Sequence, residues 1–306
     1  HFKGTALRNV LIYVILFGLW SALIVYISIH IVDAEVSSVL ITATGGFLSL
    51  MLGFRTNTAY DRFWEGRKLW SNLTGLVREY CINIWLDYKS PTEAAYKTKK
   101  DVVNLMLAFT IVAKHNLREE EELITSDIKQ LIGSLPNFDT LPNSVYSSEA
   151  FVEQNSKLVK RQIDKKTSKL PLQMLYYLIS INNDQLSKGL VGAGTHSKLL
   201  QIIEEIISVY TGMERILYTP IPLAYTVHLR QAAFIFCVIL PLEMLSYMNK
   251  RHWLTVPFVM ISVFVIYGIL AIGEEIENPF GYDPNDLPID EYISKLDIEL
   301  QSITKL

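Results

Sequence analysis

The feature that most constrains this chain is a run of 24 residues, 9–32, that contains no Lys, Arg, Asp or Glu. At about 1.5 Å per residue, a helix of this length spans roughly 36 Å, and a hydrocarbon core is about 30 Å thick. The run is too long for the apolar core of a signal peptide. It therefore predicts a membrane-spanning helix that accommodates some tilt.

Three more apolar stretches predict three more spans. The second, 36–54, is also uncharged; the third, 234–248, is interrupted by Pro241 and Glu243; the fourth is 253–272. The acidic residue in the third span should face protein or water rather than lipid. Half of all residues are hydrophobic, and the mean hydropathy is +0.25. We therefore expect an all-α integral membrane protein with four transmembrane helices.

Basic residues near the span ends predict the orientation. Lys3 and Arg8 precede the first span, and Arg55 and Arg62 follow the second, whereas the connector between these spans has no Lys or Arg. Because basic residues favour the cytoplasmic side, both chain termini are expected in the cytosol. The segments 55–222 and 273–306 are then cytosolic as well.

Lys250, Arg251 and His252 lie between the third and fourth spans and break this rule. One interpretation is tolerated local charge. The other is a rim that attracts anions at an outer mouth.

The long segment between the second and third spans reads as a set of helices, without strand-like alternation. Thr92 precedes a stretch with apolar residues at helical spacing, so it is the expected N-cap of a helix. A loop is expected over 136–148, a break over 189–194, and a stop at 219–222. Helices are expected over 94–115, 148–169, 170–186 and 197–217.

Several function classes find no support. The net charge of −3 argues against a nucleic-acid partner. Cys81 and Cys237 are the only cysteines, and the six histidines show no metal-ligand or catalytic spacing. Glu274, Glu275 and Glu277 form an acidic group that we interpret as a solvated helix end. No enzyme and no required cofactor are predicted.

The second span carries the most information. One helical stripe of it consists of small and hydroxyl residues, which suit either close helix packing or contact with water. The stripe is Ser38, Thr42, Gly45, Ser49 and Gly53. Beside it lie Gly46, Leu50 and Phe54, each one turn apart. Around a symmetry axis these three would stack as rings, and rings of Leu and Phe make an apolar neck that gates by dewetting.

The residues directly after this span, 54–70, read FRTNTAYDRFWEGRKLW and resemble the central motif of the bestrophin family. Two more blocks resemble the family in the same order: ERILYTPIPLAY over 214–225 and EEIENPFGYDPNDLP over 274–288. Together the blocks reach across most of the chain. Their amino-acid sequences are closer to those of microbial and fungal members than to those of animal members.

This resemblance implies that residues 1–306 form one channel unit of a homopentamer around a central pore. It implies a pore neck at Gly46, Leu50 and Phe54, although the family usually has a larger apolar residue in place of Gly46. It implies a second constriction at the cytosolic exit, which falls at Gly194, close to His196.

The resemblance also implies a possible calcium site after the fourth span. The matching carboxylates are Asp283 and Asp286, with backbone carbonyls near Glu275 and Asn278. The alternative is ordinary turn chemistry, with an Asx-turn before Pro284.

The function implied is a passive channel for chloride and other monovalent anions in the cell membrane. Its partners would be further copies of itself, membrane lipid and the permeant ions. One alternative is a cation-selective channel of the same fold, and another is a non-conducting structural or sensing membrane protein. The sequence begins at His1 rather than Met, and we expect residues to precede it.

Overall fold

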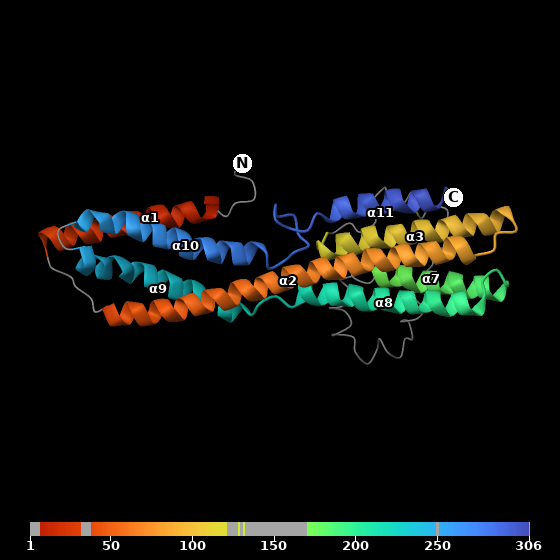
Figure 1. The fold of residues 1–306 in the computed structure, drawn as a ribbon, viewed down its shortest axis with the longest axis horizontal. Helices are drawn as coiled ribbons and strands as arrows, with labels where there is room; N and C mark the ends of the chain where they lie inside the picture. Colours follow the sequence, from red (N-terminus) through yellow and green to blue (C-terminus); the bar gives the residue numbers. More distant parts are fainter. Residues whose placement is uncertain are drawn as a thin grey trace, which may run out of the picture. The chain divides into compact units, whose positions relative to one another are not determined.

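The computed structural model describes residues 7–31, 38–120, 128, 131, 170–248 and 251–305. Within these ranges the chain forms helices joined by turns, without a strand (Figure 1). The predicted all-α class is thereby confirmed. The loop predicted over 136–148 and the helix predicted over 148–169 lie outside the described residues. The chain divides into two compact units, the first from residues 1–65 and 219–286, the second from 66–218 and 287–306.

The first unit contains the apolar helices. They are α1 (Leu7–His30), the first part of α2 (Ser38–Asp87), α9 (Leu223–Met248), the short η3 (His252–Leu254) and α10 (Thr255–Glu275). By length and hydropathy, α1, α9 and η3–α10 are able to cross a membrane. They correspond to the spans predicted over 9–32, 234–248 and 253–272, although α9 begins earlier, at Leu223. Residues 38–54 of the second predicted span form the start of α2, which continues past Phe54 to Asp87. By the same criteria of length and hydropathy, α2 is not among the described helices able to cross a membrane, so this span stays a prediction.

One apolar core holds this unit together. α1 runs beside α10 (Figure 1), and both pack with α9 and the start of α2. The core includes Phe17 of α1, Leu48 and Leu52 of α2, Leu229 of α9 and Val263 of α10. The opposite faces of α1 and α10 carry large exposed apolar side chains, among them Leu16, Leu19, Ile261 and Phe264. Faces of this kind are suited to lipid, so the unit is a membrane protein.

Pro241 and Glu243, which interrupt the third predicted span, both lie inside α9. The helix continues through Pro241. Glu243 is only 6% exposed, so its side chain faces protein, as predicted. The Trp20 indole of α1 donates to the backbone oxygen of Val238 at 3.0 Å, three residues before Pro241. α1 therefore supplies one polar contact to α9 close to Pro241.

The second unit contains the rest of α2 with α3 (Glu93–Leu117), α7 (Leu170–Ser187), α8 (Ala193–Tyr218) and α11 (Ile289–Ile303). The Thr92 hydroxyl accepts the backbone N–H of Ala95 at 3.2 Å, which confirms the predicted N-cap of α3. Gly189 has a φ of +67°, a left-handed value that suits glycine, and it lies in the predicted break. α8 ends directly before the predicted stop.

The core of the second unit includes large aromatic side chains and buried polar side chains. Trp70, Phe109 and Tyr210 are fully buried. The Tyr88 hydroxyl donates to Asn182 Oδ1 at 2.6 Å, and Asn182 Nδ2 donates to the Tyr80 hydroxyl at 3.0 Å. Buried polar groups are tolerated when they are hydrogen-bonded in this way.

Candidate pore-lining face and the polar cluster beside it

In the first unit, α2 has one buried face and one exposed face. Leu48 and Leu52 are 4% and 6% exposed, whereas Leu50 and Phe54 are 56% and 61% exposed. At about 100° per residue, Leu50 points roughly 160° away from both Leu48 and Leu52. A Cβ atom added at Gly46 would meet nothing within 4 Å. We call Gly46, Leu50 and Phe54 the exposed face of α2.

The stripe of small and hydroxyl residues lies between these two faces. A Cβ atom at Gly45 would be 3.0 Å from Cε2 of Phe236, so this glycine permits close packing against α9. Thr42, Ser49 and Gly53 are exposed. The packing interpretation therefore holds for Gly45, whereas Thr42, Ser49 and Gly53 remain open, and their contact with water stays a prediction.

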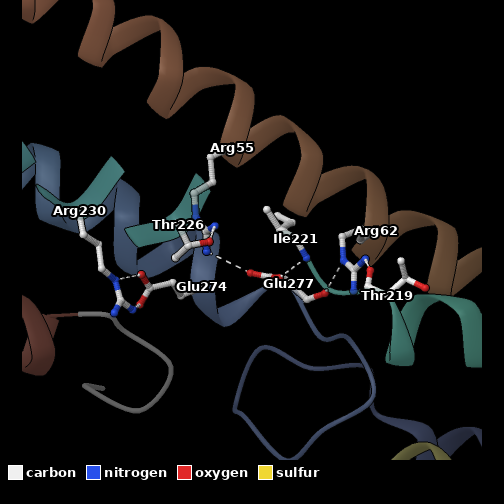
Figure 2. Close-up of polar contacts among 8 residues, drawn as sticks. All are labelled: Arg55, Arg62, Thr219, Ile221, Thr226, Arg230, Glu274 and Glu277. Carbon is white, nitrogen blue, oxygen red and sulfur yellow. Dashed lines mark hydrogen bonds and ion pairs between the residues drawn. The ribbon is translucent and has the colours of Figure 1, made fainter. Parts of the chain in front are cut away.

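Directly after Phe54, the polar residue Arg55 points into the unit. Its side chain is 2% exposed, and its guanidinium donates from Nη1 to the Thr226 hydroxyl at 2.6 Å and from Nη2 to Glu277 Oε2 at 3.0 Å (Figure 2). The other oxygen of Glu277 accepts the backbone N–H of Ile221 at 2.9 Å. Glu277, in the segment after α10, thus joins α2 to the segment just before α9 through the two oxygens of its carboxylate.

Arg62, two turns further along α2, completes this arrangement. Its Nε donates to the backbone oxygen of Glu277 at 3.1 Å and its Nη1 to that of Thr219 at 2.6 Å (Figure 2). We call Arg55, Arg62, Thr219, Ile221, Thr226 and Glu277 the polar cluster. Since a buried charge is costly unless it is paired and hydrogen-bonded, these contacts fix the rotation of α2 at the point where the exposed face ends.

The interpretation as a solvated helix end was therefore wrong for Glu277. Glu277 pairs with the buried Arg55, and Glu274 forms an ion pair with Arg230 at 2.7 Å. The Glu275 carboxylate accepts from Asn285 Nδ2 at 2.8 Å. The error arose because Arg55 and Glu277 are 222 positions apart in the chain, so no local pattern reveals their contact.

The predicted calcium residues lie in a turn that uses them internally. The Asp286 carboxylate accepts the backbone N–H of Asp283 at 2.8 Å, and Asn278 Oδ1 accepts that of Phe280 at 3.3 Å. Among the described residues, no group of three or more His, Cys, Asp and Glu side chains is arranged to hold a metal ion. The carboxylate contacts fit a turn better than a cation site, and calcium binding stays a prediction.

In the second unit, the two residues predicted at a cytosolic constriction occupy the first turn of α8. Gly194 is exposed, and a Cβ there would meet nothing within 4 Å. The imidazole Nε2 of His196 lies 2.8 Å from Asn183 Oδ1 of α7. The Thr195 hydroxyl between them donates to Asp87 at 3.0 Å. These contacts position the turn, and its role at an exit stays a prediction.

A family model for bacterial and fungal bestrophin proteins matches residues 1–302 of this chain. The chain belongs to the bacterial and fungal bestrophin family. The resemblance carried by the three sequence blocks is therefore confirmed. In this bestrophin, the exposed face of α2 and the polar cluster both belong to the first unit.

Named relatives agree with this assignment. A voltage-dependent anion channel-forming protein of Synechocystis sp. is 34% identical over 259 residues, which cover 85% of this chain and 75% of that protein. A protein of the same description from Nostoc sp. is 32% identical over 291 residues, covering 95% of this chain and 84% of that protein. A crystal structure of a bacterial bestrophin homologue from Klebsiella pneumoniae has a TM-score of 0.76 at 22% identity, over 96% of this chain and 98% of that one. The structural likeness shows that the fold is the bestrophin fold.

The sequence did not predict the polar cluster, although most of its residues lie in the three bestrophin-like blocks. Arg55 and Arg62 belong to the first bestrophin-like block, Thr219, Ile221 and the nearby prolines to the second, and Glu277 to the third. Blocks far apart in a chain that share a family pattern are candidates for one site. That signal could have suggested that the two arginines meet the glutamate.

Proposed function

We propose that this bestrophin is a passive channel for chloride and other monovalent anions, with a central pore that five copies of α2 line. In this proposal the start of α2 is the second of four transmembrane spans, the membrane is the cell membrane, and both chain termini are cytosolic. The family assignment supports a channel rather than an enzyme.

The observation that carries the proposal is the exposure of Leu50 and Phe54, at 56% and 61%, on the face of α2 opposite the core. Two large apolar side chains one turn apart, about 5.4 Å, would form two stacked rings around an axis. Water leaves such a short apolar throat readily, and an ion must shed part of its hydration to pass. Gly46 has no side chain to extend the throat, so the neck has two rings rather than three.

Lipid is the competing neighbour for this face, and the residues beside it favour another protein copy. Thr42, Ser49 and Gly53 are small or hydroxyl-bearing and exposed. Such residues allow helices to approach closely and hydrogen-bond in a membrane. Repeated copies of α2 packed along this stripe would turn Leu50 and Phe54 toward a shared axis.

The polar cluster gives the neck its orientation. Phe54 directly precedes Arg55, whose guanidinium is held by Thr226 and Glu277. With α2 fixed in rotation at Arg55, Phe54 cannot turn toward the core. Aromatic ring edges carry partial positive charge, so a ring of Phe54 edges would favour anions. The names of the Synechocystis and Nostoc relatives support the same selectivity.

Ion flux from liposomes that contain the purified full chain tests this function. The ion flux should persist when sodium is replaced by a large organic cation. It should stop when chloride is replaced by gluconate. The opposite dependence would identify a cation channel. Flux equal to that of protein-free liposomes would identify a non-conducting membrane protein.

The assembly has a separate test. The mass of the protein in detergent, after subtraction of bound detergent, should equal five chains. A stable monomer would refute the central pore, because a single α2 cannot enclose an axis.

A further inference from the structure

A pocket of about 680 Å³ lies in the second unit, between the end of α2, the start of α3 and the end of α11. Its volume falls within the range of about 300–1,000 Å³ that is usual for small-molecule sites. None of the described lining residues is acidic. We call it the Lys99 pocket, and the lining residues that matter are Ile82, Trp85, Leu86, Tyr96, Lys99 and Lys305.

Most of the wall is apolar, and the described residues leave much of it uncovered. Ile82 and Leu86 of α2 are 41% and 75% exposed. The rings of Trp85 and Tyr96 meet edge to face, with centroids 5.9 Å apart. Aliphatic and aromatic surfaces together suit a flat apolar body, which gains both area burial and ring contacts there.

The charged member of the pocket is unusual because it is buried. Lys99 is 8% exposed, and its ammonium lies 4.7 Å from the centroid of the Trp85 ring. It donates to the backbone oxygen of Tyr88 at 3.4 Å, which is a long hydrogen bond. Burial lowers the pKa of Lys99, and no carboxylate of the described residues pairs with it.

An ammonium group has three N–H donors, so one long hydrogen bond and one aromatic face leave it with unused donor capacity. A buried charge without a counter-charge is costly, and an anion in the pocket would remove that cost. Lys305, also in the wall, adds a second positive charge without a described acidic neighbour in the pocket.

We propose that the Lys99 pocket binds a small aromatic carboxylate, with its carboxylate against Lys99 and its flat body against Trp85 and Tyr96. An inorganic anion such as chloride would leave the apolar wall unused. A polyphosphate would require more cations than Lys99 and Lys305 provide. The proposal does not rest on the channel function, because binding is measured without current.

Calorimetric titration of the full chain in lipid nanodiscs tests this site, with empty nanodiscs as the blank. The probes are 2-naphthoate and its neutral analogue 2-naphthamide, which share the same apolar body. A charge-assisted hydrogen bond should make naphthoate bind at least about tenfold more tightly than naphthamide. Equal binding of the two probes overturns the proposal. Absence of naphthoate binding also overturns it.

Variants locate the site. Lys99→Met should abolish the preference for naphthoate, and Lys99→Arg should keep it. Lys100→Met is the matched control, since it removes an exposed lysine from the next position of α3 and should leave both affinities unchanged. Should Lys100→Met reduce binding as much as Lys99→Met, the effect is general charge and the proposal fails.

A further variant covers the case in which Lys99→Met does not fold. Tyr96 is 43% exposed, so Tyr96→Ala should fold, and it removes wall area without touching the ammonium. The affinities for naphthoate and naphthamide should then fall by the same factor, several-fold. Unchanged affinity for both probes in Tyr96→Ala would place the ligand elsewhere and overturn the proposal.

Discussion

Within two turns of α2, residues of similar chemistry occupy opposite environments. Leu48 and Leu52 are buried in the core of the first unit, whereas Leu50, midway between them, is 56% exposed. Arg55 is buried and Phe54 beside it is exposed, the reverse of what their polarity suggests. Polarity alone therefore does not decide which face of a helix in a channel is structural. The ion pair with Glu277 explains why the arginine is buried, and the proposed pore would explain why the phenylalanine is exposed.

This contrast gives the two faces different experimental signatures. Substitutions on the buried face should reduce the free energy of unfolding. Substitutions on the exposed face should leave that free energy nearly unchanged and alter conduction. Unfolding by titration with sodium dodecyl sulfate measures the first quantity, and liposome flux measures the second.

The largest effect is expected for Glu277→Gln. This change leaves the Arg55 guanidinium, at 2% exposure, without a counter-charge. Breaking a buried pair in this way costs about 3–5 kcal/mol. Unfolding titrations should show this loss.

Glu274→Gln is the matched control for that substitution. It breaks the ion pair with Arg230, in which the two side chains are 34% and 57% exposed. Exposed ion pairs contribute about 0–1 kcal/mol to stability, so the free energy of unfolding of the control should fall only slightly. Equal losses in the two variants would show that the polar cluster does not anchor α2.

A smaller loss is expected for Gly45→Val. The new side chain would begin 3.0 Å from Cε2 of Phe236, and overpacking of this kind costs about 1–3 kcal/mol. Gly46→Val is the control, because a Cβ there meets nothing within 4 Å and both variants replace a helical glycine. The control should unfold like the natural chain but conduct less, since it adds a third ring to the neck. A greater stability loss for Gly46→Val than for Gly45→Val would show that Gly46, rather than Gly45, lies on the packed side of α2.

The sequence predicts most of the helices because their signals are local. The uncharged runs, the Thr92 cap and the glycine break at 189–194 each depend on neighbouring residues. The start of α9 at Leu223 was missed because His228 and Arg230 interrupt the apolar pattern, although the Arg230 charge is paired with Glu274.

The exposed face of α2 was predictable for a similar reason: Gly46, Leu50 and Phe54 share one helix, and the spacing of residues on a helix is known in advance. The polar cluster was not, because its contacts join three segments of the chain. Only the family blocks connect those segments, and they do not say which atoms meet.

A loss of about 1 kcal/mol is expected for Asp286→Ala, because the Asp286 carboxylate accepts the backbone N–H of Asp283 much as an N-cap does. Asp286→Asn keeps an acceptor oxygen and should lose less. If the turn interpretation is right, flux through the natural protein is the same in calcium and in chelator. If chelator reduces the flux and Asp283→Asn with Asp286→Asn removes that response, a calcium site exists there.

The smallest change in stability is expected for the double substitution Leu50→Ala and Phe54→Ala. Both side chains are more than half exposed, so their truncation should change the free energy of unfolding by only about 0.5 kcal/mol. Conductance should rise, because a throat lined by alanine is wider and holds water. Leu48→Ala is the control: it truncates a leucine that is 4% exposed and should cost about 2–5 kcal/mol.

The double variant separates the roles of the exposed face, because stability and conductance are measured on the same protein. If it assembles normally and conducts like the natural chain, Leu50 and Phe54 face lipid or a neighbouring helix, and the neck lies elsewhere. If it fails to fold, the two side chains are packed between subunits, and the exposed face of α2 is an assembly surface. Only increased conductance with nearly unchanged stability fits side chains that project into water on the channel axis, because such side chains contribute little to packing and much to the barrier for ions.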